Sequence, residues 1–103
     1  MKLSILITLL NEELVLPQTL REISNQLEKM LGKELSDYEI LYIDDGSSDK
    51  TFELIEEFAR ENDRIKYIRF SRNFGRESGI LAGFKYASGD AVMVMDGDLQ
   101  HPP

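Results

Sequence analysis

Apolar residues along the chain fall into short runs separated by segments with helical spacing. Four runs, each bounded by polar residues, predict strands at residues 3–9, 38–44, 65–70 and 91–96. The first and last runs are almost continuously apolar, which is typical of strands in a parallel sheet covered on both faces.

The first two segments between these runs are predicted to be helical. In the first, apolar residues recur at intervals of four and three, with Pro17 in the first turn and Gly32 as a stop. The second has a shorter stripe after Ser48 or Asp49, either of which suits an N-cap. The two stripes are Leu16, Leu20, Ile23, Leu27 and Met30, then Phe52, Ile55 and Phe58.

The third helical segment, ESGILAGFKYASGD, is less regular. It places Ile80, Phe84 and Ala87 on one side and ends near residue 89. Gly79 and Gly83 lie four residues apart and share a face, although a glycine inside a helix costs about 1 kcal/mol relative to alanine. We interpret this pair as a site of close packing between the helix and a sheet rather than as a ligand contact.

The regular alternation of strands and helices predicts a parallel α/β sheet with right-handed crossovers. The chain has 103 residues, no internal repeat and no linker, so we expect one small unit. No apolar stretch approaches the roughly 18 to 20 residues that cross a bilayer. The net charge of −7 argues against a nucleic-acid partner, and the absence of cysteine excludes disulfide and thiolate chemistry.

A polar cluster follows each predicted strand, at residues 11–13, 44–49, 71–77 and 96–101. The carboxyl ends of parallel strands lie along one edge, where open α/β sheets bind ligands. We therefore expect the four clusters to form a single site.

The first two clusters have both structural and ligand-binding interpretations. Asn11 is suited to capping a helix, with Glu12 favouring the positive end of the helix. Asp44 and Asp45 are adjacent, so their carboxylates repel one another unless a ligand or another group binds them. Their carboxylates can accept hydrogen bonds from a nucleobase or a ribose, and Gly46 allows the chain to turn sharply after them.

The other two clusters indicate phosphate and metal chemistry. Arg72 and Arg76 bring concentrated positive charge to this edge, which suits a diphosphate. Asp96, Asp98 and Gln100 offer oxygen ligands at alternate positions after an apolar strand, and such ligands suit Mg²⁺ or Mn²⁺.

The motifs ILITLLNEE, YIDDGSSDKT, SRNFGRESGILAGF and MDGDLQHPP, in this order, resemble the amino-terminal half of glycosyltransferase family 2 enzymes with the GT-A fold. The DLQHPP extension resembles the polyprenyl-phosphate branch, which includes dolichol-phosphate mannosyltransferases and bactoprenol glucosyltransferases. The resemblance implies a Rossmann-like half-sheet in the order 3-2-1-4. It also implies that residues 1–103 are the donor-binding part of the domain, truncated after the D-x-D loop.

The same resemblance implies roles for individual residues. The nucleotide-sugar ligands would be Glu12, Asp44, Asp45, Arg72 and Asp96, and the metal ligands Asp96, Asp98 and Gln100. Thr8 and Leu10 stand where the family usually has a proline and an aromatic residue, which weakens any expectation of base stacking there. No catalytic residue is assigned within the chain.

The implied reaction is metal-dependent, inverting transfer of a hexose from a UDP- or GDP-sugar to a polyprenyl phosphate, in cell-wall or glycan biosynthesis. We expect a cytoplasmic protein whose full-length form acts at the cytoplasmic face of a membrane. We also expect the isolated chain to be inactive and its exposed sheet edge to invite formation of a homo-oligomer.

Other functions are compatible with parts of the pattern. A family 2 enzyme acting on a saccharide acceptor and a non-catalytic nucleotide- or Mg²⁺-binding module both remain open, as does a chain that binds nothing. A phosphatase of the haloacid dehalogenase type needs a threonine pattern after D-x-D, where this chain has Leu99 and Gln100. A receiver-like signalling module needs its acidic pair after the first strand, whereas Asp44 and Asp45 follow the second.

Overall fold

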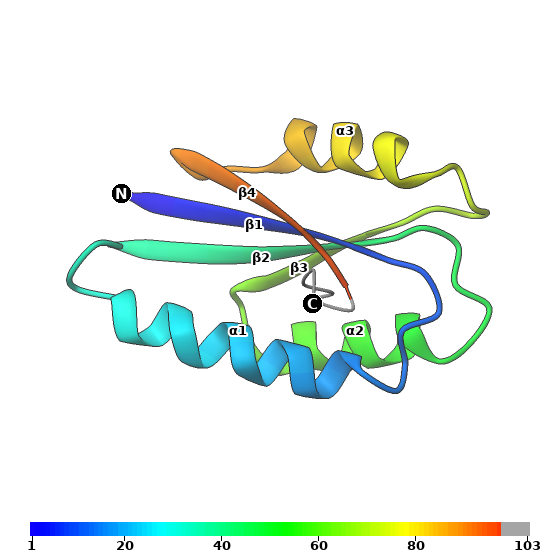
Figure 1. The fold of residues 1–103 in the computed structure, drawn as a ribbon, viewed down its shortest axis with the longest axis horizontal. Coiled ribbons are helices and arrows are strands. Elements are labelled where there is room, and N and C mark those ends of the chain that lie inside the picture. Colours follow the sequence, from blue (N-terminus) through cyan, green and yellow to red (C-terminus); the bar gives the residue numbers. More distant parts are fainter. Residues whose placement is uncertain (98–103) are drawn as a thin grey trace, which may run out of the picture.

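The computed structural model describes residues 1–97, and the predicted metal ligands Asp98 and Gln100 lie outside this range. Strands and helices alternate, and the four strands form one parallel sheet in the order β3-β2-β1-β4 (Figure 1). The predicted fold class and strand order are therefore confirmed. The elements are β1 (Lys2–Leu9), α1 (Leu16–Met30), β2 (Asp37–Asp44), α2 (Thr51–Glu61), β3 (Ile65–Arg69), α3 (Arg76–Tyr86) and β4 (Ala91–Asp96).

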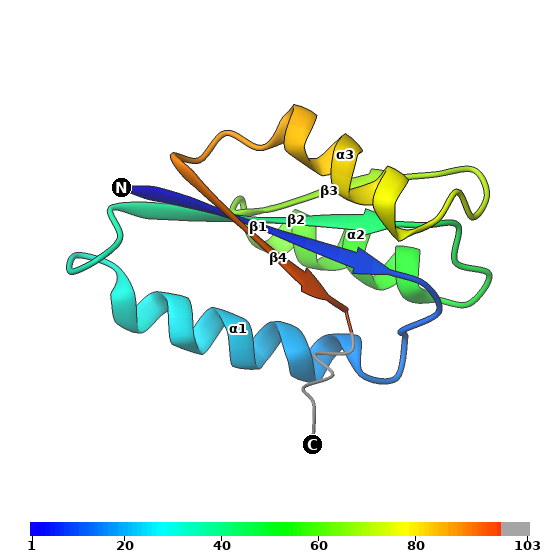
Figure 2. The ribbon, with the colours of Figure 1, turned by 45° about the horizontal axis from the view of Figure 1, so that its top comes forward.

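The sheet is covered by α1 and α2 on one face and by α3 on the other (Figures 1 and 2). The larger apolar cluster joins β1 and β2 to α1 and α2, and its members include Ile5, Tyr42 and Ile55. A smaller cluster of Leu6, Leu41 and Ile43 faces α3. Most of the buried apolar side chains therefore belong to, or pack against, the two central strands, β1 and β2.

The first two helices follow their predicted patterns. In α1 the buried side is the expected stripe, with Leu16, Leu20, Ile23 and Leu27 all inside. The N-cap of α2 is Lys50, with no side-chain capping hydrogen bond, so the predicted cap at Ser48 or Asp49 is wrong. Asp49, one residue earlier, still accepts the N–H of Thr51 at 2.9 Å through Oδ1. None of the helices in the described range is long and apolar enough to span a lipid bilayer.

Helix α3 departs from its expected orientation. Its buried positions are Gly79 and Gly83, while Phe84 is 51% exposed, so the predicted apolar side is not the side that packs on the sheet. A Cβ at Gly83 would lie 2.5 Å from Leu6 Cδ2. The glycines let the helix backbone approach the sheet directly, which confirms the predicted close packing and explains why the larger apolar residues point elsewhere.

Strand β4 lies at the edge of the sheet, beside β1. It packs on both faces, with Ala91 and Met95 against the larger cluster and Val92 and Val94 against the smaller one. None of the residues Ala91–Asp96 is fully buried, and Met93 is 48% exposed, so the expectation that this run is covered on both faces is confirmed only in part. An apolar run predicts a strand, but not how many neighbours will cover it.

A buried carboxylate ties the connection between α3 and β4 to the sheet. Glu39 Oε2 accepts hydrogen bonds from Ser4 Oγ at 2.6 Å and from the Ser88 N–H at 2.7 Å. Its Oε1 accepts from Lys66 Nζ at 3.1 Å. Burial alone would raise the pKa of Glu39, but these hydrogen bonds outweigh it and lower the pKa to about 2. The ionised Glu39 thereby fixes the point where β4 begins.

Candidate functional site

A pocket of about 330 Å³ lies at the carboxyl edge of the sheet, where the ends of β1, β2 and β4 meet the start of α3. Its walls come from all of these elements, as expected for a parallel sheet whose strand ends share one edge. The lining residues are Thr8, Leu9, Leu10, Glu12, Asp45, Asn73, Gly75, Arg76, Asp96 and Gly97.

The connection after β1 is held against the connection after β2. Asn11 adopts a left-handed backbone conformation with φ of 55°, and its side-chain oxygen accepts the N–H groups of Ser48 and Asp49 at 2.9 and 3.3 Å. The N–H of Glu12 donates to Thr51 Oγ1 at 2.8 Å. Asn11 therefore does not cap α1, and the interlocked connections place Glu12 in the pocket wall.

The adjacent aspartates at the end of β2 have separate partners, which explains how they tolerate one another. Asp44 is fully buried; its Oδ1 accepts the N–H of Ser47 at 3.1 Å and its Oδ2 lies 3.8 Å from Arg69 Nε. Asp45 accepts the N–H groups of Phe74 and Gly75 at 2.8 and 3.0 Å and also lines the pocket. The two carboxylates thus serve different segments.

An ion pair crosses the pocket. Arg76 Nε, at the first position of α3, donates to Oδ1 of Asp96, at the end of β4, over 2.6 Å. Thr8 is paired with Asp96 in the sheet, and its hydroxyl lies 3.5 Å from the same Oδ1. Both charged side chains are about half exposed, at 53% and 54%, so each remains accessible to a ligand.

Three of the predicted ligand residues, Glu12, Asp45 and Asp96, meet in this pocket. Asp44 lies buried outside the lining, and the guanidinium of Arg72 stacks on the Phe74 ring at 4.7 Å rather than lining the pocket. The cation that does line it is Arg76, which was paired with Arg72 as a source of positive charge but was not among the predicted ligands. Its position at a helix start, where a cation is disfavoured, is the sequence signal that marks it.

The oxygen atoms of the predicted metal ligands are of the kind that binds a hard divalent cation. Asp96 presents a half-exposed carboxylate to the pocket, and carboxylate and amide oxygens are the ligands that Mg²⁺ and Mn²⁺ prefer. Within residues 1–97, no three His, Cys, Asp or Glu side chains are grouped to hold a metal ion. The other two predicted ligands, Asp98 and Gln100, lie outside the described residues.

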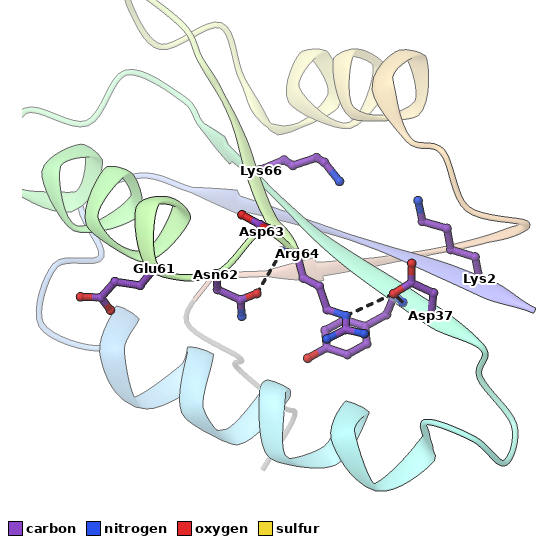
Figure 3. Close-up of a pocket in the computed structure, with 8 residues that line it drawn as sticks. Lys2, Asp37, Glu61, Asn62, Asp63, Arg64 and Lys66 are labelled. Carbon is purple, nitrogen blue, oxygen red and sulfur yellow. Dashed lines mark hydrogen bonds and ion pairs between the residues drawn. The ribbon is translucent and has the colours of Figure 1, made fainter.

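A second hollow, of about 470 Å³, lies at the opposite, amino edge of the sheet (Figure 3). Its lining mixes cations such as Lys2 and Arg64 with acids such as Asp37 and Asp63. Arg64 Nε donates to Asp37 Oδ1 at 3.1 Å, so part of this charge is already neutralised. The carboxyl edge, where chemically distinct groups from four elements converge, is the stronger candidate.

Known proteins share the sequence pattern and the fold of this chain. Residues 4–103 match the family model described as Glycosyl transferase family 2. A curated relative, the putative glycosyltransferase CsbB of Bacillus subtilis (strain 168), is 52% identical over 80 residues. That match covers 78% of this chain and 24% of the relative, so the chain spans about a quarter of that protein.

Two solved structures share the fold. The S. aureus TarS 1–349 structure in complex with UDP superposes with a TM-score of 0.79 at 24% identity, covering 95% of this chain and 28% of that one. The mannosyltransferase PcManGT from Pyrobaculum calidifontis, in complex with GDP-Man and Mn²⁺, gives 0.77 at 18% identity, covering 93% and 27%. At these identities the likeness establishes the fold alone, which is the Rossmann-like half of a GT-A domain.

Proposed function

Because this chain belongs to glycosyltransferase family 2, we propose that its carboxyl-edge pocket binds the nucleoside diphosphate sugar from which a hexose is transferred. The observation that carries the proposal is the convergence of Glu12, Asp45 and Asp96 with Arg76 in one pocket. Acidic groups accept hydrogen bonds from a nucleoside, and an arginine pairs with a diphosphate. Few other small ligands need both kinds of group side by side.

Within the pocket, residues from different strand ends bind different parts of the nucleotide. Glu12 and Asp45 hold the nucleoside, with Asp44 in a supporting role at the end of β2. Arg72 and Arg76, which flank the turn before α3, bind the diphosphate. The half-exposed guanidinium of Arg76 supports this assignment, because it can leave Asp96 without unfolding any packed element.

A divalent cation is the proposed cofactor, held by Asp96, Asp98 and Gln100. When bound, such a cation stabilises the negative charge that builds on a departing nucleoside diphosphate. The Mn²⁺ complex of PcManGT with GDP-Man supports a cation in this fold, and the UDP complex of TarS supports a nucleotide. UDP- and GDP-sugars are both candidate donors for this chain.

The proposed acceptor is a polyprenyl phosphate, used with inversion by the full-length protein at the cytoplasmic face of a membrane. The motif DLQHPP supports this acceptor over a saccharide. A phosphate acceptor is already anionic near neutral pH, so it needs no strong base from the protein. We propose that residues 1–103 alone transfer no sugar, and that the exposed edge of β4 can pair with a second copy.

Calorimetric titration of the chain with UDP and GDP, with and without Mn²⁺, tests donor binding. We expect binding that depends on Mn²⁺, and at least a tenfold loss of affinity in Asp96→Ala, because a carboxylate ligand is removed. Asp63→Asn, which removes an exposed acid at the opposite edge, is the matched control and is expected to bind like the wild type. An affinity for UDP and GDP that is unchanged by removal of Mn²⁺ and by Asp96→Ala would refute the proposed site.

The identity of the acceptor can be tested by measuring sugar transfer by the full-length protein to each candidate acceptor. Transfer to a polyprenyl phosphate but not to a free saccharide is the expected result. Transfer only to a saccharide would overturn the proposed acceptor while leaving the donor pocket intact. Sugar transfer by residues 1–103 alone would refute the proposed inactivity of this part of the protein.

A further inference from the structure

The segment that joins β3 to α3, residues 70–75, lies along the carboxyl edge beside the pocket. It carries Arg72 and leads directly into Arg76, the first residue of α3. Its first residue, Phe70, donates its N–H to the carbonyl of Asp44 at 2.9 Å and so extends the pairing of β3 with β2. Residues 71–75 follow the end of β3 and are held against the end of β2 by Asp45 and Gly46.

Asp45 holds the backbone of this segment with both carboxylate oxygens. Oδ1 accepts the N–H of Phe74 at 2.8 Å, and Oδ2 accepts the N–H of Gly75 at 3.0 Å. The Gly75 N–H is shared with Asn73 Oδ1, which lies 2.9 Å from it. Its own N–H donates to the carbonyl of Leu9 at 2.9 Å, which anchors the residue to the end of β1. Asp45 is only 6% exposed, so these charge-assisted hydrogen bonds are shielded from water.

Gly46 provides the surface on which the segment rests. A Cβ at this position would lie 2.5 Å from the carbonyl carbon of Arg72 and 2.7 Å from the nitrogen of Asn73. The φ of Gly46 is +83°, a conformation that side-chain-bearing residues rarely adopt. Backbone therefore packs on backbone here, and Gly46 itself is not part of the pocket lining.

These contacts act on the ion pair across the pocket. Gly75, held by Asp45, immediately precedes Arg76, whose Nε donates to Asp96 Oδ1 at 2.6 Å. A shift of the Gly75 backbone moves the start of α3 and thus the guanidinium. The end of β2 is in this way connected to the end of β4 through residues 71–75 and the start of α3.

We propose that Asp45 is a positioning residue: by holding the backbone of Phe74 and Gly75 against Gly46, it places Arg76 opposite Asp96. This inference rests on the proposed function, because in a donor pocket that placement sets the affinity for a nucleoside diphosphate. The remaining lone pairs of Asp45 still face the pocket, so positioning adds to any contact it makes with a nucleoside. Asp45 thus affects diphosphate binding indirectly, by setting the position of Arg76.

The first test needs no ligand. In Asp45→Asn the amide retains one acceptor oxygen but presents N–H₂ to the other backbone N–H, so one hydrogen bond is lost. Asn73 Oδ1 also accepts the Gly75 N–H, so the readout is the Arg76 Nε–H, whose acceptor Asp96 is unchanged. We expect its exchange, followed by NMR, to quicken by about tenfold. The Asp63→Asn control should leave this rate unchanged. An unaltered rate in a folded Asp45→Asn protein would overturn the inference, whether or not the pocket binds nucleotide.

The second test is a double-mutant cycle on the affinity for UDP and GDP in the presence of Mn²⁺. We expect Asp45→Asn and Arg76→Gln each to weaken binding by about tenfold, and the double variant to be little weaker than either one. A purely structural or a direct nucleoside role of Asp45 predicts additive losses, about a hundredfold together, and that result would overturn the inference. Absence of nucleotide binding by the wild type would instead refute the proposed function.

Gly46→Ala perturbs the same contact from the other side and substitutes no residue that lines the pocket. Its Cβ would push on the backbone of Arg72 and Asn73, so we expect it to reproduce the faster exchange of the Arg76 Nε–H and the weaker nucleotide binding. This variant also serves if Asp45→Asn does not fold. A folded Gly46→Ala protein in which Arg76 and nucleotide affinity are unchanged would show that the segment does not position Arg76.

Discussion

Replacement of Glu39 by glutamine tests how strongly a buried carboxylate stabilises this fold. Glu39 is 2% exposed and accepts hydrogen bonds from Ser4, Ser88 and Lys66. Its pKa falls from an ordinary value of 4.5 to about 2 in the folded protein. At about 1.4 kcal/mol for each pKa unit, this shift corresponds to roughly 3 kcal/mol of folding free energy.

The sign of the pH dependence follows from the direction of the shift. A carboxylate with a depressed folded-state pKa stabilises the protein fully above its unfolded pKa, near 4.5, and loses that contribution as the pH falls towards 2. We therefore expect Glu39→Gln to unfold about 3 kcal/mol more easily at pH 7. The difference between wild type and variant should shrink progressively between about pH 5 and pH 2.

Urea unfolding followed by circular dichroism at a series of pH values measures this difference. Glu57→Gln, an exposed glutamate on α2, is the matched control and should change the free energy of unfolding by less than about 0.5 kcal/mol. Comparing each variant with the wild type at the same pH cancels the titration of all other groups. Parallel curves for wild type and Glu39→Gln across the acid range would refute the reasoning.

Five further substitutions, at four positions, test the packing and the connections around the site. Gly83→Ala places a Cβ 2.5 Å from the side chain of the fully buried Leu6, so urea unfolding should show a loss of about 1 to 3 kcal/mol. Gly79→Ala, with its nearest atom at 3.1 Å, should cost less, and equal costs would contradict the packing argument. Asn11→Gly keeps access to the φ of 55° but loses the hydrogen bonds to Ser48 and Asp49, whereas Asn11→Ala loses these bonds and also disfavours that φ. Thermal unfolding should therefore find the alanine variant less stable than the glycine variant by about 1 kcal/mol. The reverse order would exclude backbone strain as the cause. Asp49→Ala should cost about 1 kcal/mol by removing the acceptor of the Thr51 N–H. Burial would raise the pKa of Asp49, but hydrogen bonds from Thr51 and Glu13 outweigh it and lower this pKa below its ordinary value. The cost of Asp49→Ala should therefore diminish in acid, and a cost that does not vary with pH would argue against a charged acceptor at this position.

The order and type of the elements could be predicted from the sequence because they depend on local patterns. Apolar runs such as residues 38–44 and helical stripes such as that of α1 are each contained in a short stretch of chain. Alternation of the two then leaves few topologies, since crossovers between parallel strands have a fixed hand. Convergence of Glu12, Asp45 and Asp96 at one edge followed from parallel strands alone.

What the tertiary structure decided was which side chain meets which partner. The sequence showed that Asp44 and Asp45 need partners, but it did not show that Asp44 would face Ser47 and Arg69 while Asp45 held Phe74 and Gly75. The lining by Arg76 rather than Arg72, and the packing of α3 through its glycines rather than Phe84, were decided in the same way. These outcomes depend on distances of a few ångströms between residues far apart in the chain, and no local periodicity encodes such distances.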